Sequence, residues 1–247
     1  MSDNESFLTH LIELRDRLTR ALVAVLVVFL CLFPFASDLF DLLAKPLMSV
    51  LPEGSKMIAT GVVAPFIIPV KVALVLALGV ALPYVLYQAW AFVAPGLYRH
   101  EKRFAMPMLV ASVVLFFAGV AFCYFFVFGV VFKFVYSIAP KSINVAPDID
   151  NYFSFVLGMF VAFGVTFEVP IAVILLVKMG FVSVAKLREI RPYVIVGAFV
   201  VAAVVTPPDV LSQIMLAIPL WVLYEAGIVA AALMMRGKPA QQSPDAT

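Results

Sequence analysis

Long apolar segments alternate with short polar segments along the whole chain. Residues 104–132 are apolar on almost every helical face, whereas the strands of a membrane barrel would alternate apolar and polar residues. In hydrocarbon only helices or a closed barrel satisfy the backbone. The pattern therefore predicts an all-α integral membrane protein with six transmembrane helices. Their expected bounds are about 20–36, 67–93, 104–137, 152–178, 193–206 and 210–234.

The polar segments predict what joins and flanks these spans. Residues 1–19 are expected to form an amphipathic helix on the cytoplasmic side, because Leu8, Leu11, Ile12, Arg15, Leu18 and Leu22 recur at helical spacing. Glu13 and Arg17, and likewise Asp16 and Arg20, are spaced to pair on its other face. Residues 37–61 and 138–151 should be external loops, the first with a short helix at 38–44, and 236–247 a disordered cytoplasmic tail.

The fifth expected span is unusually short. About 14 residues separate the polar connector before it from Thr206-Pro207-Pro208-Asp209. At 1.5 Å per residue such a helix covers roughly 21 Å, less than a hydrocarbon core of about 30 Å. Either the membrane is thinner here or the turn at 206–209 lies below the outer interface.

Composition places most of the chain in lipid. Of the 247 residues 64% are apolar and 13% charged, and the mean hydropathy is +1.10. Cys31 and Cys123 lie in apolar segments without CxxC spacing and are expected to be buried thiols. The acidic residues near the start and the absence of a cleavage site predict that no signal peptide is removed.

The distribution of cations predicts the topology. With the N-terminus inside, twelve Lys and Arg fall on the cytoplasmic side and five outside or near it. This bias favours cytoplasmic locations for both termini. The inner twelve are Arg15, Arg17, Arg20, Arg99, Lys102, Arg103, Lys178, Lys186, Arg188, Arg191, Arg236 and Lys238, and the outer five are Lys45, Lys56, Lys71, Lys133 and Lys141.

The polar residues argue against an enzyme. His10 and His100 lie in separate polar flanks, and neither an HExxH nor a GxSxG motif is present. No catalytic residue, metal or cofactor is expected. Glu168 stands out as a carboxylate well inside an apolar stretch, where it either serves function or fixes helix packing as a neutral, hydrogen-bonded acid. Pro170 frees the Thr166 carbonyl from its usual helical partner, and Glu225 in the sixth span is expected either to contact a partner or to snorkel to the interface.

Glu13 and Glu101 are acidic residues embedded in basic cytoplasmic flanks. Each either forms a surface pair with neighbouring Arg17 or Arg103, or offers its carboxylate to an arginine-bearing peptide. Arginine binds a carboxylate through two parallel hydrogen bonds, which lysine cannot do. Both readings are compatible with the residues alone.

Several stretches, in order along nearly the whole chain, resemble the TatC family. The most specific are residues 7–18, FLTHLIELRDRL, and residues 87–98, YQAWAFVAPGLY, followed by Glu101 and Arg103. Three later stretches agree with them: residues 163–170, FGVTFEVP; the run from Arg191-Pro192-Tyr193 to Thr206-Pro207-Pro208-Asp209; and Ser212-Gln213 through Pro219 to Tyr224-Glu225.

The resemblance implies a receptor in the bacterial cytoplasmic membrane that recognises twin-arginine signal peptides. It implies export of folded proteins, powered by the proton-motive force, together with small single-span partners of the TatA and TatB types and other copies of itself. It implies a cupped arrangement of the six helices with Glu168 on the concave side, and no nucleic-acid partner. The implied signal-peptide residues are Glu13, Arg15, Phe92, Glu101 and Arg103, and the implied contact or structural residues are Pro46, Thr206, Pro207, Asp209, Gln213, Tyr224 and Glu225.

The chain departs from the family pattern in one place. Family members often carry an acidic residue before the second span, whereas residues 60–66 contain none here. One alternative is a six-span secondary transporter with Glu168 as proton relay, which should take up substrate without partner subunits. The other is a scaffold that binds partners without discriminating between peptides.

Overall fold

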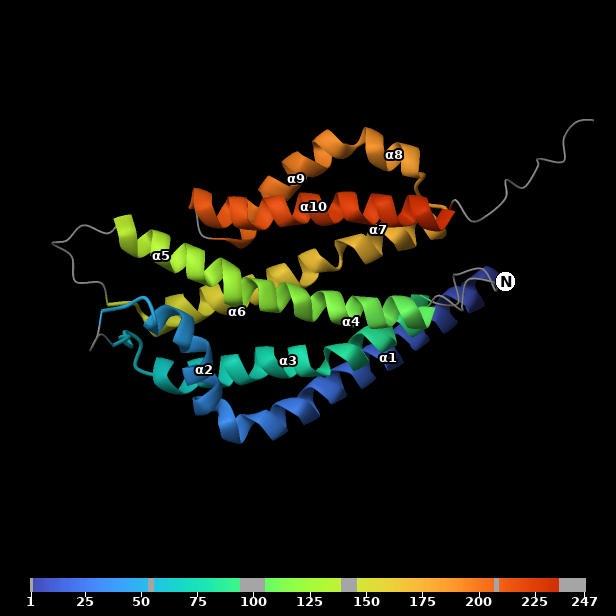
Figure 1. Ribbon diagram of the computed structural model, residues 1–247. Helices are drawn as coiled ribbons and strands as arrows, with labels where there is room; N and C mark the ends of the chain where they lie inside the picture. The colour runs from blue at the N-terminus through green and yellow to red at the C-terminus, as the bar shows by residue number, and fades with distance from the viewer. Residues whose placement is uncertain (1, 53–55, 94–104, 139–145, 207–208, 236–247) are drawn as a thin grey trace, which may run out of the picture.

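The computed structural model describes residues 2–52, 56–93, 105–138, 146–206 and 209–235, and within them it is helical apart from short loops and one isolated β-bridge (Figure 1). The all-α prediction is confirmed. The elements are α1 Ser2–Leu32, the 3₁₀ turn η1 Phe33–Phe35, α2 Ala36–Met48, α3 Ala64–Val93, α4 Ala105–Phe122, the π-helical turn η4 Cys123–Val127, α5 Phe128–Ile138, α6 Ile149–Phe167, α7 Val169–Lys178, α8 Val184–Glu189, α9 Arg191–Val205 and α10 Val210–Met235.

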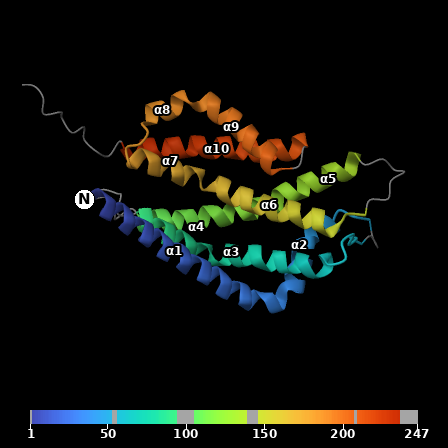
Figure 2. The same ribbon diagram turned by 180° about the vertical axis from the view of Figure 1, so that it is seen from behind.

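Five helical segments are long and apolar enough to cross a membrane. They are Leu11–Met48, Ala64–Phe92, Met106–Ile138, Ile149–Lys178 and Val210–Met235. Arg191–Val205 is a shorter apolar helix, in line with the short fifth span expected. Seen from both sides, the start of α1 and the end of α10 lie at the same end of the bundle, beside the α7–α8 connection (Figures 1 and 2).

The helix boundaries differ from the expected ones in four places. The amphipathic segment and the first span form one continuous helix, α1, and the short helix expected at 38–44 is the 13-residue α2. The third passage contains the π-helical turn η4 between α4 and α5. The fourth passage breaks at Glu168, where α6 ends and α7 begins with Pro170 in its first turn.

The core is built from aromatic and aliphatic side chains of the central helices. Phe128, Phe153 and Phe163, from α5 and α6, are fully buried, and Cys123 is buried beside them. Cys31 is exposed, so the expectation of a buried thiol was wrong there. The reason is that α1 packs mainly along α3, which leaves its other faces outward.

Two segments far apart in sequence, both expected to be external, are joined in space. The Ile58 N–H donates to the Pro147 carbonyl, and the Ile149 N–H donates to the Ile58 carbonyl, both at 2.9 Å. The Asp148 carboxylate accepts from the Thr60 hydroxyl at 2.7 Å and caps the start of α6. These contacts fix the connection before α3 against the N-terminus of α6.

Candidate functional site

Glu13 belongs to a small polar network between α1 and α3. The Arg17 guanidinium donates to the same Glu13 oxygen, Oε1, from Nε at 2.9 Å and from Nη2 at 2.6 Å. Its Nη1 lies 3.4 Å from Oε1 of Gln88, which is buried in α3. The expected Glu13–Arg17 pair is confirmed, and Arg17 connects it to the neighbouring helix.

The second expected pair, between Asp16 and Arg20, was wrong. Asp16 accepts instead from the adjacent Arg15, with Arg15 Nη2 at 2.9 Å and Nε at 3.1 Å. The Arg15 side chain is 72% exposed, so nothing packs against it to direct it elsewhere, and it reaches its neighbour directly. Arg20 consequently has no acidic partner in the described part of the chain.

The remaining residues predicted to bind a signal peptide are described only in part. Phe92 is half-buried near the end of α3, one turn beyond Gln88. Glu101 and Arg103 lie outside the described residues. The structure therefore brings Glu13 next to the end of α3 but does not describe the segment that follows this helix.

Glu168 occupies the break between α6 and α7. Its side chain is half-buried, and its Oε1 is buried with no hydrogen-bond partner among the described residues. The Ser112 hydroxyl of α4 lies near the carboxyl group. Gly227 of α10 packs against the adjacent Pro170, because a Cβ at this glycine would lie 2.9 Å from the Pro170 Cα.

Glu225 forms an intramolecular ion pair. Its Oε2 lies 2.6 Å from Nη2 of Arg191, at the start of α9. The neighbouring Tyr224 is buried, and its hydroxyl donates to the Leu187 carbonyl of α8 at 2.8 Å. Adjacent residues of α10 therefore hold α8 and the start of α9.

The other predicted contact residues lie at helix ends. Thr206 caps the C-terminal end of α9, with its hydroxyl donating to the Ala202 carbonyl at 2.8 Å, and Asp209 Oδ1 accepts from the Ser212 N–H at 2.7 Å. The Gln213 N–H donates to the Asp209 carbonyl at 3.2 Å. Pro46 lies inside α2, and Pro207 is outside the described residues.

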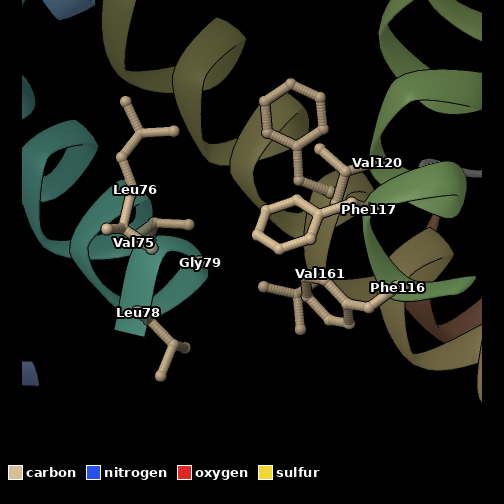
Figure 3. A pocket seen from close by; sticks show the side chains of 10 residues that line it. Val75, Leu76, Leu78, Gly79, Phe116, Phe117, Val120 and Val161 are labelled. Atoms are coloured by element: carbon tan, nitrogen blue, oxygen red, sulfur yellow. The ribbon is translucent and has the colours of Figure 1, made fainter. Parts of the chain in front are cut away.

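Two of the hollows between helices are lined by both α3 and α6. A groove of about 510 Å³ is formed by α3, α6, α9 and α10, and Thr166 is the one hydroxyl residue among its described lining. A smaller hollow of about 110 Å³ lies between α3, α4 and α6, where Phe116 and Phe117 face Val75 and Leu76 (Figure 3). The described residues that line this smaller hollow are all apolar, so they offer no group to orient a hydrophilic substrate.

Comparison with known proteins agrees with this arrangement. The family model described as "Sec-independent protein translocase protein (TatC)" matches residues 9–219. The chain belongs to the TatC family. The protein named "Sec-independent protein translocase protein TatC" from Azotobacter chroococcum is 53% identical over 94% of this chain and 91% of its own length. Its namesake from Escherichia coli K12 is 51% identical over 92% of this chain and 88% of its own length.

A solved structure agrees in fold as well as in sequence. The crystal structure of the twin arginine translocase receptor TatC superposes with a TM-score of 0.82 at 39% identity, covering 92% of this chain and all of the other. The family resemblance is thus confirmed. This chain is a membrane protein of the Sec-independent translocase, and its homologues are named for transport rather than catalysis.

Three polar residues of these networks were missed as site residues. Gln88 and Ser112 are polar side chains within apolar spans, where an unpaired polar group is costly and a partner should have been sought. Asp148 follows Pro147 just before α6, a position typical of a helix cap. The sequence gives these signals but does not identify the partner of any of the three.

Proposed function

We propose that this chain is the receptor subunit of a twin-arginine translocase and that Glu13 accepts an arginine of the signal peptide. The observation that carries the proposal is the Glu13–Arg17 contact, since this carboxylate already binds a guanidinium through two donors. Lysine offers only one compact ammonium and cannot reproduce this contact. Glu13 is thus suited to distinguish Arg-Arg from Lys-Lys.

Glu101 supplies the second carboxylate in this proposal, with Arg15, Phe92 and Arg103 around the peptide. The peptide docks in extended form, and each charged hydrogen bond contributes roughly 1.5 to 3 kcal/mol. Its apolar segment then enters the groove formed by α3, α6, α9 and α10, whose lining is almost entirely apolar. Glu168 follows the groove residue Thr166 by two positions in the chain. Its carboxyl group meets a polar group of the guest or of a partner helix.

Partner subunits complete the proposed complex. Small single-span TatA- and TatB-type helices dock on α9 and α10, where Ile195, Phe199 and Trp221 line an apolar depression of about 200 Å³. Copies of this chain contact each other through the outer segment that begins with α2, the helix that contains Pro46. Both termini lie in the cytoplasm of a bacterium. The complex exports folded cargo across the inner membrane, and the proton-motive force drives this export.

Export in a bacterium that lacks its own TatC protein tests this function. A fluorescent protein carrying an Arg-Arg signal peptide should reach the periplasm when this chain is supplied, and the Lys-Lys version should not. Glu13→Gln should abolish the difference, whereas Glu189→Gln, which removes an exposed carboxylate on α8, should preserve it. Equal export of the two signal peptides by the parent chain would overturn the proposal.

A secondary transporter is less well supported by the same observations. Such a protein needs a polar site for a hydrophilic substrate between its helices. The two hollows lined by α3 and α6 offer a single hydroxyl, that of Thr166, and the polar residues Thr19, Arg20 and Tyr84 line a groove on the outside of the bundle instead. No described feature favours this alternative over the receptor.

A further inference from the structure

A groove of about 320 Å³ lies between α1 and α3, on the outside of the bundle. The described residues that line it are Thr19, Arg20, Val23 and Ala24 from α1 and Tyr84 from α3. Along α1 this is the point at which charged residues give way to an apolar helix. The groove is therefore cationic at Arg20 and apolar toward Val23 and Ala24.

The two polar groups that point to a ligand here are Arg20 and Tyr84. Asp16, one helical turn before Arg20, is paired with Arg15, so Arg20 makes no ion pair or hydrogen bond within the described residues. The Tyr84 hydroxyl likewise has no partner there, although the Tyr84 ring lies against Tyr87 with centroids 6.3 Å apart. The Thr19 hydroxyl is already used, since it donates to the Arg15 carbonyl at 2.8 Å.

In the part of α1 that follows Arg20, the helix surface is apolar and is not covered by other parts of the protein. Val23 is 52% exposed and Leu26 is 53% exposed. In a membrane protein such a surface faces acyl chains, and an arginine beside a tyrosine at its end is typical of headgroup depth. Lipid is therefore the occupant that can contact both ends of the groove at once.

We propose that this groove binds an anionic phospholipid. The Arg20 guanidinium holds the phosphodiester through parallel hydrogen bonds, the Tyr84 hydroxyl donates a further one, and an acyl chain follows Val23 and Ala24. An anionic headgroup is favoured over a zwitterionic one because no described carboxylate lines the groove to receive an ammonium group. Bound in this way, the lipid holds α1 against α3 within two turns of Glu13.

Native mass spectrometry of the full chain with phosphatidylglycerol or phosphatidylcholine of identical acyl chains tests the proposal. We expect tighter retention of phosphatidylglycerol by the parent and about fivefold weaker retention by Arg20→Gln, the effect of one cation at an anionic lipid surface. Arg20→Lys should lose less. Arg188→Gln removes one cation from exposed α8 and should behave as the parent. Equal losses in Arg20→Gln and Arg188→Gln would show charge attraction without a site and overturn the proposal.

Two further experiments test whether the shape of the groove matters as well as its charge, and whether the ligand is a lipid rather than free phosphate. Val23→Trp fills the groove from an exposed position without changing charge, and it should also weaken retention while leaving the melting temperature unchanged. Inorganic phosphate should not stabilise the parent as phosphatidylglycerol does. Full stabilisation by inorganic phosphate, or unchanged lipid retention in Val23→Trp, would contradict a phospholipid site.

Discussion

Arg17 donates from both Nε and Nη2 to a single carboxylate oxygen of Glu13, at 2.9 and 2.6 Å. The same guanidinium reaches Gln88 of α3, 3.4 Å away. Glu13 is therefore oriented by a cation that is itself tethered to the neighbouring helix.

Gln88→Leu should weaken the tether without disturbing the fold, because leucine suits an apolar span better than an unpaired amide does. Arg17 would lose its partner on α3, and Glu13 would sample more positions. We expect two- to fivefold weaker binding of an Arg-Arg signal peptide, because the lost hydrogen bond is long, at 3.4 Å, and affects Glu13 only through Arg17. Isothermal calorimetry on protein in nanodiscs measures this. Binding as tight as that of the parent would show that Gln88 does not position Glu13.

Acidification should loosen the contact between the segment before α3 and α6. The Thr60 hydroxyl and the Asn151 N–H, by hydrogen bonding to Asp148, hold the pKa of its carboxyl below the usual range. A lowered pKa in the folded state means that this stabilisation is complete above the ordinary pKa and is lost as pH falls through the lowered value.

Asp148→Asn should therefore lower the melting temperature at neutral pH, with a difference from the parent that shrinks as pH falls below about 4. Thr60→Val should show the same trend, because it removes the first of these hydrogen bonds. Scanning fluorimetry from pH 3 to 7 provides the comparison. A difference that stayed constant over this range would contradict the assigned role of the Asp148 charge.

Gly227→Ala should force α10 away from α7. The added Cβ would lie 2.9 Å from the Pro170 Cα, and backbone cannot move aside as a flexible side chain can. We expect a loss of about 1 to 3 kcal/mol in stability, the usual range for overpacking. Gly129→Ala is the matched control, since its Cβ would meet nothing within 4 Å and alanine favours a helix. Equal melting temperatures for the two variants would refute the close approach.

The Arg191–Glu225 pair should show measurable coupling in a double-mutant cycle. Its Glu225 side chain is 26% exposed and its Arg191 side chain 42%, so we expect about 0.5 to 1 kcal/mol after allowing for solvent screening. The pair Lys186–Glu189 on α8, with exposures of 57% and 69%, should give a coupling near zero. A coupling no larger for Arg191–Glu225 than for this control would mean that the pair does not hold α9 to α10.

The sequence predicted the features that depend on local pattern. Apolar runs and proline positions indicated the spans and the shortness of the helix before Thr206. The i,i+4 spacing also indicated the Glu13–Arg17 pair. These features depend on residues close together in the chain, where helical periodicity already fixes the geometry.

The contacts between distant segments could not be predicted in this way. Nothing local shows that Arg17 meets Gln88, that Glu225 meets Arg191, or that Asp148 meets Thr60. The pairing of Asp16 with Arg15 instead of Arg20 could not be predicted either, because both cations lie within reach of this exposed carboxylate. Each of these depends on how helices pack or on competition between neighbours, which spacing alone does not determine.

The central claim concerns Glu13 and is tested most directly by peptide binding to the purified chain in nanodiscs. We predict that an Arg-Arg signal peptide binds at least tenfold more tightly than its Lys-Lys variant and that Glu13→Gln removes most of this preference, because one charged hydrogen bond contributes roughly 1.5 to 3 kcal/mol. Equal affinity of the parent for both peptides, or an unchanged preference in Glu13→Gln, would contradict the account.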